Sequence, residues 1–345
     1  MEFNPKISNI IFKTNFNKNL GLGNLLRCIR IAKEFPNKKK IFVVENAINN
    51  KIKKFLPNNC KIIINKNKKS HIIEDAKNFL SIPELSSKSI VIIDDIRANH
   101  IWQKLIKNHV KKLIVVDDLA LNKNFCDIYI NYKFTTKPKH ISHIKRLNQK
   151  KTKLLLGKDY LILDKNLIKK KNLNRPKKIL ISFGNSFDFS QAKNLIKKIL
   201  TVTPKKTLVL VCIGLLSKNY QYIINLSKTH NNLKIIYKKI FIEKILNKTD
   251  IFIGSCGSSL YENGYLNIPS IFFSISPDQK NEIKDIRKIG HNLLYKKKDI
   301  NSKKVISAYK YLYKNYLIIK NKNLNKKNIF NTKGLSKLKK IILSK

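Results

Sequence analysis

One stretch in the last third of the chain constrains the fold more than any other. Residues 250–253 form a short apolar run, which is typical of a strand buried on both faces. A turn of small residues, Gly254 to Ser259, follows it. Next come a helical segment, Leu260 to Leu266, and a second apolar run, Ile268 to Phe273. A strand, a small-residue turn, a helix and a strand in this order predict one unit of an α/β sheet.

The small-residue turn also has the chemistry of an anion site. The N–H groups that open a helix have no partners within it, and the helix dipole adds partial positive charge there. Gly257, Ser258 and Ser259 would present such donors to an anion, for which a diphosphate fits best. Glu262 falls on the first helical turn, where a carboxylate can accept two hydroxyl hydrogen bonds from a ribose. A tight turn with an N-cap serine explains the same residues without a ligand, and this alternative stays open.

The alternation of strands and helices runs through the chain twice. We expect strands at 7–12, 41–44, 61–64, 89–93, 113–116 and 128–131 in the first half, and at 178–182, 208–213, 233–236, 250–253, 268–273 and 290–295 in the second. We expect helices at 25–35, 99–108, 189–199, 241–246, 260–266, 279–288, 303–317 and 335–343.

A break near 165–176 separates the two halves. The pattern therefore predicts an α/β protein with two doubly wound, Rossmann-like parallel sheets, one in residues 1–165 and one in 177–300. Residues 301–345 are expected to supply closing helices. Because Gly/Ser turns follow a strand in both halves, we expect a ligand in a cleft between them.

Polar residues in the first half also mark strand ends. Gly21-Leu-Gly23 links the first strand to the first helix and resembles a phosphate-binding turn, but the third glycine of a dinucleotide fingerprint is absent. The pairs Asp94-Asp95 and Asp117-Asp118 each end a strand, where ligands bind in open α/β sheets. An N-cap with a solvated carboxylate is the competing explanation, and it is the favoured one for Asp118.

The formal charge of +51 raises the question of nucleic acid. Only six of the 72 basic residues are Arg, whereas nucleic-acid sites favour Arg for bidentate contacts. The lysines are spread along the whole chain together with many Asn and Ile residues, and all three amino acids have A/T-rich codons. We therefore expect a solvated lysine surface and no specific nucleic-acid partner, although anionic ligands will be attracted.

Several classes of site and location are disfavoured. Five dispersed cysteines without a C-x-x-C pair fit reduced thiols in the cytoplasm better than disulfides or a zinc site. No apolar run reaches 18 residues, so no membrane span is expected. The first residues lack the apolar core of a secretory signal. His140 and His143 have a spacing that suits one metal on a helix, but no third ligand is near, and a solvated basic loop is expected instead.

Taken together, several segments resemble one family. They are 21–28, 94–95, 116–119 with 126–127, 154–160, 181–184 and 249–269. Their order and spacing are similar to the UDP-sugar hydrolases of pseudaminic acid biosynthesis. Those enzymes remove UDP from UDP-2,4-diacetamido-2,4,6-trideoxy-β-L-altropyranose. The family is related to spore-coat polysaccharide proteins and has the two-domain architecture of GT-B glycosyltransferases. The resemblance spans about residues 7–300 and is most specific at 254–269.

The resemblance implies a role for each matching residue. The second half would bind UDP, with Gly257, Ser258 and Ser259 at the diphosphate and Glu262 at the ribose. The backbone near Phe241 and Ile242 would face the uracil. A second turn, including Gly184, Asn185 and Ser186, would line the cleft, and Gln279 would contact sugar or phosphate. The sugar would sit against the loop that holds Gly21, Gly23 and Arg27. No cofactor or metal is implied, and partners would be the UDP-sugar and other pathway enzymes.

One departure from the family pattern concerns the chemistry itself. The pattern Gly-x-Gly-His-x-x-Arg-Cys has a histidine as its proposed general base, and Asn24 occupies that position here. An imidazole can take a proton from an attacking water near neutral pH, whereas a carboxamide cannot. Asn24 can still orient a water or a sugar hydroxyl. On position alone, Asp95 is the nearest candidate for a replacement base.

Three functions therefore remain open at this stage. The first is a UDP-sugar hydrolase of nonulosonic acid or surface polysaccharide biosynthesis, in which water attacks the anomeric carbon. The second is a GT-B-type glycosyltransferase, in which an acceptor hydroxyl replaces the water. The third is a UDP-sugar-binding protein with impaired catalysis, because the family histidine is Asn24.

Overall fold

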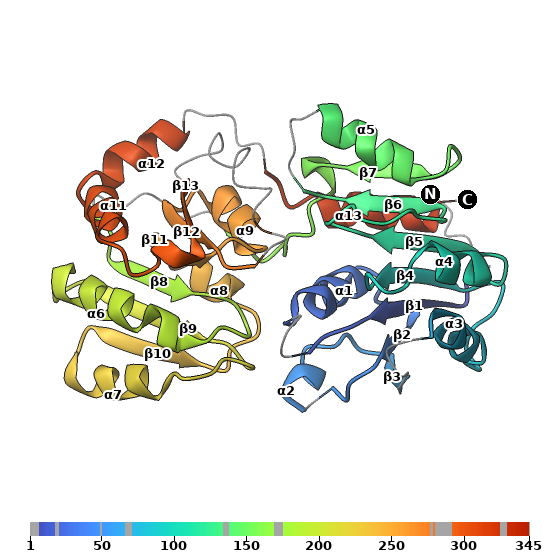
Figure 1. The fold of residues 1–345 in the computed structure, drawn as a ribbon, viewed down its shortest axis with the longest axis horizontal. Coiled ribbons are helices and arrows are strands. Elements are labelled where there is room, and N and C mark those ends of the chain that lie inside the picture. The colour runs from blue at the N-terminus through green and yellow to red at the C-terminus, as the bar shows by residue number, and fades with distance from the viewer. Residues whose placement is uncertain are drawn as a thin grey trace. The chain divides into compact units, whose positions relative to one another are not determined.

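The structure is a computed structural model that describes residues 7–17, 21–48, 50–65, 71–133, 138–168, 175–276, 279, 292–324 and 330–344. The chain divides into two compact units. Unit 1 comprises Met1–Ile162 and Thr332–Lys345, and unit 2 comprises Leu163–Asn331. Each unit is built around its own parallel sheet (Figure 1).

Unit 1 holds a seven-stranded sheet in the order β3-β2-β1-β4-β5-β6-β7. Its elements are β1 (Asn9–Thr14), α1 (Gly23–Lys33), β2 (Lys39–Val44), α2 (Asn50–Lys53), β3 (Cys60–Ile64), α3 (Ile72–Leu80), β4 (Ile90–Asp94), α4 (His100–Lys107), β5 (Lys112–Val116), β6 (Ile128–Asn131), α5 (Pro138–Leu147), β7 (Lys153–Leu156), the 3-10 turn η1 (Lys158–Tyr160) and α13 (Gly334–Leu343). All of its strand pairs are parallel.

Unit 2 holds a six-stranded sheet in the order β10-β9-β8-β11-β12-β13, again with parallel pairs throughout. Its elements are β8 (Lys178–Ser182), η2 (Phe189–Ala192), α6 (Lys193–Val202), β9 (Leu208–Ile213), α7 (Gln221–Thr229), β10 (Leu233–Tyr237), α8 (Glu243–Leu246), β11 (Ile251–Ser255), α9 (Ser259–Leu266), β12 (Ser270–Ser274), β13 (Asn292–Lys296), η4 (Lys297–Asp299), α11 (Lys303–Lys314) and α12 (Tyr316–Leu324).

The central strands of both sheets are buried on both faces. Every residue of β1 and β4 in unit 1, and of β11 and β12 in unit 2, is buried. Parallel sheets covered by crossover helices require this, which explains why these strands consist of continuous Ile, Val and Phe runs. One apolar core packs within each unit. That of unit 1 includes Trp102 and Phe79, whose ring centroids lie 4.9 Å apart, and that of unit 2 includes Phe183 and Phe273.

The strand predictions are confirmed, with shifts of no more than two residues at any end. His140 and His143, which were expected in a solvated basic loop, lie instead within the helix α5, and the strand β7 was not predicted. The helix expected over 303–317 is divided into α11 and α12 by Asn315, whose side-chain Nδ2 donates to the carbonyl of Tyr311 at 3.0 Å. The helix expected over 279–288 lies outside the described residues apart from Gln279.

The last helix, α13, packs in unit 1, far in sequence from its neighbours there. A Cβ added to Gly334 would lie 2.1 Å from the carbonyl oxygen of Leu161, so only glycine allows this approach. The Lys112 ammonium donates to the carbonyls of Ile342 and Ser344, at 3.3 and 2.7 Å. These contacts attach the C-terminal helix, drawn in red, to the sheet of unit 1 (Figure 1).

Strands β8 and β11 approach each other closely at Gly254. A Cβ at this position would lie 1.7 Å from the carbonyl oxygen of Ser182, its partner in the β8–β11 register. Because overpacking a buried site typically costs about 1–3 kcal/mol, we expect Gly254→Ala to destabilise unit 2 by at least that amount. Thermal and urea unfolding followed by circular dichroism would measure the loss.

Gly257→Ala is the matched control for this prediction. A Cβ at Gly257 would meet nothing within 4 Å, so its stability should stay within about 0.5 kcal/mol of the wild type. Equal stability of the two variants would contradict the close strand approach at Gly254.

Candidate functional site

In each unit the strand order reverses between two central strands. The reversal lies between β1 and β4 in unit 1 and between β8 and β11 in unit 2. In open α/β sheets, ligands bind beyond the carboxyl ends of the strands at such a switch point. The residues that follow β8 and β11, and those that follow β1, β4 and β5, are therefore the places to look for chemistry.

In unit 2 the turn before α9 presents unused donors. Within the described part of the chain, the backbone N–H groups of Gly257, Ser258 and Ser259 donate to no backbone oxygen. Ser258 is exposed, and no side chain caps the helix at this residue. The hydroxyl of Ser259 donates to the Ser255 carbonyl at 2.9 Å, which holds the turn against the end of β11. Three unsatisfied N–H groups at a helix N-terminus form an anion-binding arrangement.

A second turn, from Gly184 to Ser186, follows β8. Gly184 has a φ of +87°, and a Cβ there would come within 3.7 Å of the Ser255 Oγ. The segment after β9 packs against this turn. A Cβ on Gly214 would lie 2.4 Å from the Asn185 Cα, and the Leu216 N–H donates to the Asn185 carbonyl at 2.7 Å. The close approach keeps the Gly184 turn beside the end of β11.

The other site residues predicted in unit 2 lie outside these two turns. Glu262 lies on the first turn of α9 and is only 1% exposed, so its carboxylate is covered in this structure. Phe241 and Ile242 are half-buried and connect β10 to the short helix α8. The Gln279 side-chain oxygen accepts a hydrogen bond from the Ile275 N–H at 3.0 Å. The structure therefore brings together the turns after β8 and β11, while the roles of these other residues stay predictions.

In unit 1, Gly21 and Gly23 lie just before and at the start of α1. Gly21 adopts a φ of +72°, which favours glycine, and its N–H donates to the Asn17 carbonyl at 2.8 Å. Gly23 begins α1 and is exposed. Asn24, on the first turn, is half-buried. Its Nδ2 donates to the Asp94 carbonyl at 3.3 Å, so the carboxamide is attached to the end of β4.

Arg27 is the centre of a buried polar cluster. Its Nε and Nη2 donate to the two oxygens of Asp94, each at 2.6 Å. Its Nη1 donates to Asp118 Oδ2 at 2.9 Å and to the Tyr132 hydroxyl at 2.5 Å, and its Nη2 also donates to Asn24 Oδ1 at 3.1 Å. A guanidinium has five N–H donors, so all five are engaged within unit 1. In this structure Arg27 links α1 to the ends of β4, β5 and β6, and its contact with a ligand stays a prediction.

The two carboxylates that contact Arg27 differ in their surroundings. One guanidinium faces two carboxylates, and the Asp94 side chain is only 3% exposed. Burial raises the pKa of Asp94 to about 6, against the opposing effect of the Arg27 charge. Burial acts in the same direction on Asp118, but the positive charges of Arg27 and Lys133 outweigh it and lower the pKa of Asp118. Asp118 therefore carries a negative charge at the edge of the sheet.

Asp95 belongs to a different network. Its Oδ1 accepts from the Arg97 N–H at 3.1 Å and from Arg97 Nε at 3.0 Å, and its Oδ2 accepts from Arg97 Nη2 at 2.7 Å. Arg97 also pairs with Glu45, which accepts from Asn15 Nδ2 at 3.0 Å. Both oxygens of Asp95 are thus engaged by one arginine. Its role as a replacement base stays a prediction.

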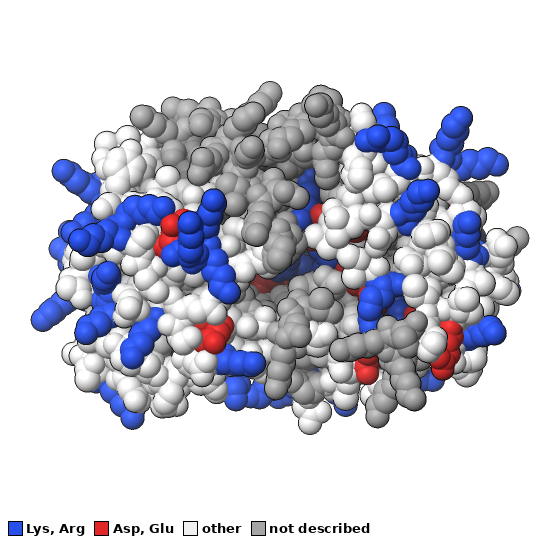
Figure 2. All heavy atoms as spheres, viewed as in Figure 1, with Lys and Arg blue, Asp and Glu red and all other residues white. Residues whose placement is uncertain are grey.

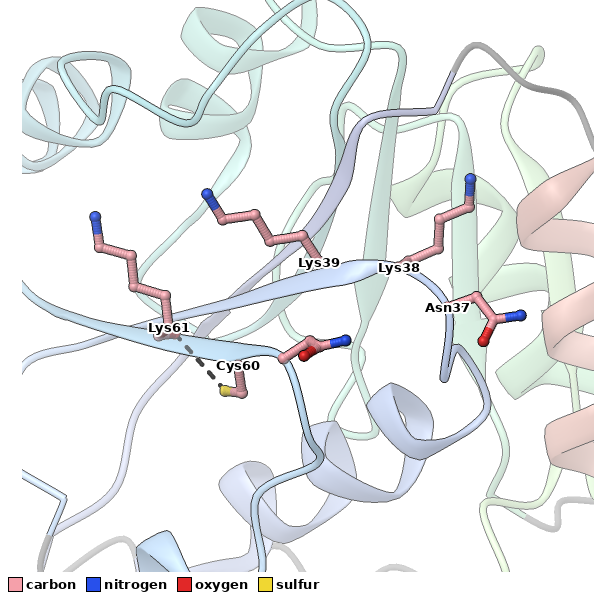
Figure 3. A pocket seen from close by; sticks show the side chains of 6 residues that line it. Asn37, Lys38, Lys39, Cys60 and Lys61 are labelled. Atoms are coloured by element: carbon pink, nitrogen blue, oxygen red, sulfur yellow. Dashed lines mark hydrogen bonds between the residues drawn. The ribbon is translucent and has the colours of Figure 1, made fainter.

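Two features away from the strand carboxyl ends bear on the choice of site. A pocket of about 440 Å³ is lined by Asn37, Lys38, Lys39, Asn59, Cys60 and Lys61 (Figure 3). These residues lie at the amino ends of β2 and β3, opposite the edge where ligands bind in such sheets. On the face shown in Figure 2, Lys and Arg side chains are distributed over both units with uncharged surface between them.

Two features are absent from the residues that the structure describes. They contain no group of three or more His, Cys, Asp or Glu residues arranged to hold a metal ion. No helix within them is long and apolar enough to cross a membrane. His143 is one of the two histidines whose spacing would suit a metal on a helix. Its Nε2 lies 3.0 Å from the Ala120 carbonyl oxygen.

Comparisons with known proteins support the fold and not a family. No family model and no curated protein sequence matches the chain. Among solved structures of similar fold, Staphylococcus aureus MnaA bound to UDP has a TM-score of 0.62 at 11% identity, with 96% of this chain and 95% of that one covered. Anabaena HepE in complex with UDP and glucose gives 0.56 at 12%, covering 98% and 100%. A UDP-glucosyltransferase from Polygonum tinctorium gives 0.57 at 12%, covering 98% and 99%.

At such low identities the likeness shows the fold alone. Together with the two strand orders, it confirms the predicted class of two doubly wound, Rossmann-like domains in one GT-B-like chain. The placement of a ligand between the domains stays a prediction.

The sequence singled out Asn24, Arg27 and both Asp pairs, but not their relation to one another. It also missed Tyr132, whose hydroxyl completes the Arg27 cluster. One signal was available, because Asp94, Asp118 and Tyr132 all lie at or just after the carboxyl ends of neighbouring strands. Residues at these positions converge on one edge of a parallel sheet.

The Arg27 cluster predicts a large effect on stability. Arg27→Met should destabilise unit 1 by about 3–5 kcal/mol, because it leaves the buried Asp94 carboxylate without a compensating charge. Urea unfolding followed by tryptophan fluorescence would measure this loss, since Trp102 lies in the core of unit 1.

Lys337→Met serves as the matched control in the same unit. Lys337 pairs with Asp159 at 3.5 Å, and both side chains are about half exposed. Loss of such a surface pair should cost no more than about 1 kcal/mol. A similar cost for both variants would mean that the Arg27 cluster contributes little to the stability of unit 1.

Proposed function

We propose that the chain is a UDP-sugar hydrolase of nonulosonic (pseudaminic) acid or surface polysaccharide biosynthesis. In the proposed reaction, water attacks the anomeric carbon of the sugar and UDP leaves. The substrate class follows from the resemblance to the hydrolases of UDP-2,4-diacetamido-2,4,6-trideoxy-β-L-altropyranose. Such an enzyme would act in the cytoplasm, with the UDP-sugar as its small-molecule partner and with other pathway enzymes supplying and consuming the sugar.

The observation that carries this proposal is the turn before α9. The N–H groups of Gly257, Ser258 and Ser259 donate to no described backbone oxygen and lie at the switch point of the unit 2 sheet. A diphosphate is the ligand that this arrangement fits best, because its oxygens accept several N–H bonds and its charge complements the helix dipole. Similar folds hold UDP in the MnaA and HepE structures, which supports the choice of nucleotide.

The other residues would complete the nucleotide site. We assign the ribose hydroxyls to Glu262 and the uracil to the backbone at Phe241 and Ile242. Gly184, Asn185 and Ser186 would approach the phosphates from the turn after β8, and Gln279 would contact sugar or phosphate. The close packing of Gly214 against Asn185 supports a fixed position for the β8 turn. Lysines and helix N-termini can stabilise the leaving diphosphate, so the proposal includes no metal and no cofactor.

The sugar would bind at unit 1, near Gly21 and Gly23. Asn24 occupies the position of the family histidine and cannot accept a proton from water. Its Oδ1 accepts from Arg27 and its Nδ2 donates to the Asp94 carbonyl, so its orientation is fixed. A fixed carboxamide suits the positioning of a sugar hydroxyl or of the attacking water. Arg27 would then act by orienting Asn24 as well as by closing the sugar site.

The main alternative is a GT-B-type glycosyltransferase. The absence of a histidine base at Asn24 favours it, and the likeness to a UDP-glucosyltransferase fold is compatible with it. In that case an acceptor hydroxyl would take the place of water at the same carbon. A protein that binds the UDP-sugar without turning it over is the third alternative.

Incubation with the UDP-linked diacetamido sugar, followed over time by proton NMR, separates these functions. We expect UDP and free sugar to appear together at equal rates, without any acceptor. Turnover only after addition of a polysaccharide acceptor would mean that the chain is a transferase and not a hydrolase. Binding of the UDP-sugar without any product would leave only the binding protein, and absence of binding would contradict all three.

A further inference from the structure

We propose that Asp118, rather than Asp95, is the general base of the reaction. This inference rests on the proposed function, because it names the group that takes the proton from the nucleophile. Asp118 follows β5 at the carboxyl edge of the unit 1 sheet and belongs to the cluster around Arg27.

Asp118 lies in the same cluster as Asn24. Asn24 is at the position where the hydrolases that the chain resembles have their base, and both residues contact the same guanidinium. Arg27 Nη2 donates to Asn24 Oδ1 at 3.1 Å, and Nη1 donates to Asp118 Oδ2 at 2.9 Å. The two terminal nitrogens of one planar group therefore contact both the carboxamide and the carboxylate. Asp95 makes no contact with this group in the described structure, because Arg97, which also pairs with Glu45, engages it elsewhere.

Asp118 also has an oxygen that is available to accept a proton. Asp118 uses Oδ2 for Arg27, whereas its Oδ1 accepts no hydrogen bond from another described residue, and the side chain is 25% exposed. Asp94 and Asp95 are each only 3% exposed and have both oxygens engaged by an arginine. Of these three carboxylates, only Asp118 combines an anchored oxygen with one that can accept a proton from water.

The surroundings of Asp118 also keep its carboxyl group ionised. Burial acts to raise the pKa of Asp118, but the positive charges of Arg27 and Lys133 outweigh it and lower this pKa. An ionised carboxylate can accept a proton from water.

The proposed step conserves atoms and electron pairs. A lone pair of the water oxygen forms the new bond to the anomeric carbon while Oδ1 of Asp118 takes one water proton. The bond from the anomeric carbon to the diphosphate oxygen breaks, and its electron pair leaves with UDP. Asp118 then returns the proton to solvent. The products are the free sugar, which keeps the oxygen of the water, and UDP.

The test compares substitutions that remove one carboxylate charge each. In Asp118→Asn, turnover of UDP-2,4-diacetamido-2,4,6-trideoxy-β-L-altropyranose should fall about 10²- to 10⁴-fold in kcat. The affinity for UDP, measured by calorimetry, should stay unchanged. Sodium formate should restore part of the activity of Asp118→Ala, because it supplies a carboxylate to the vacated site. A residue that only maintained the structure would not respond to formate.

Asp117→Asn is the matched control, one residue away on the same loop. Asp117 Oδ1 accepts from the N–H groups of Leu119 and Ala120, both at 2.9 Å, and an asparagine retains this turn. This variant should keep wild-type kcat. Circular dichroism of all variants would verify that each is folded.

The outcomes separate this inference from the proposed function. Wild-type hydrolysis that persists in Asp118→Asn, or that is lost in Asp95→Asn alone, overturns Asp118 as the base and leaves the hydrolase in place. Acceptor-dependent transfer that is lost in Asp118→Asn retains the base and overturns hydrolysis. A wild-type protein that turns the UDP-sugar over neither with nor without an acceptor overturns both.

Discussion

Parallel pairing of the strands is the constraint on which the rest of this structure depends. When every strand of a sheet runs in one direction, all carboxyl ends fall on one edge, and the connections must cross back as helices. The loops after the strands of each unit are therefore gathered on the same edge, although they are far apart in sequence. The continuous Ile, Val and Phe runs of β1, β4, β11 and β12 are required by the burial of both faces of each sheet.

The two edges that result differ in their chemistry. At the edge of unit 2, the backbone N–H groups before α9 have no described backbone partner, and small residues keep the two turns close together. At the edge of unit 1, the donors of Arg27 are all engaged by neighbouring side chains, while one carboxylate oxygen of Asp118 accepts from no other described residue. The first arrangement suits an anion, whereas the second suits a proton acceptor. In the proposed reaction, the anion is the leaving diphosphate and the proton acceptor serves the attack on the anomeric carbon.

The sequence predicted most strands well, but it missed the helices α3, α5 and α7 and the side-chain contacts, for a physical reason. Strands such as 178–182 and 208–213 were found at their exact bounds because burial imposes an apolar run that is visible locally. The turn at Gly257 was visible because glycine and serine mark helix starts. The Arg27 cluster was not visible, since its partners Asp94, Asp118 and Tyr132 lie 67, 91 and 105 residues away. Only the assembled sheet brings them within hydrogen-bond distance.

Hydrogen–deuterium exchange with and without UDP tests the central claim most directly, because it locates the ligand without requiring turnover. The account predicts that UDP slows exchange in peptides covering 182–186 and 254–262, at the switch point of unit 2. Peptides covering 37–39 and 59–61, which line the pocket at the opposite end of the unit 1 strands, should not change (Figure 3). Protection confined to those lysine-rich peptides, or no protection at saturating UDP, would contradict the assignment of the strand carboxyl ends as the functional edge.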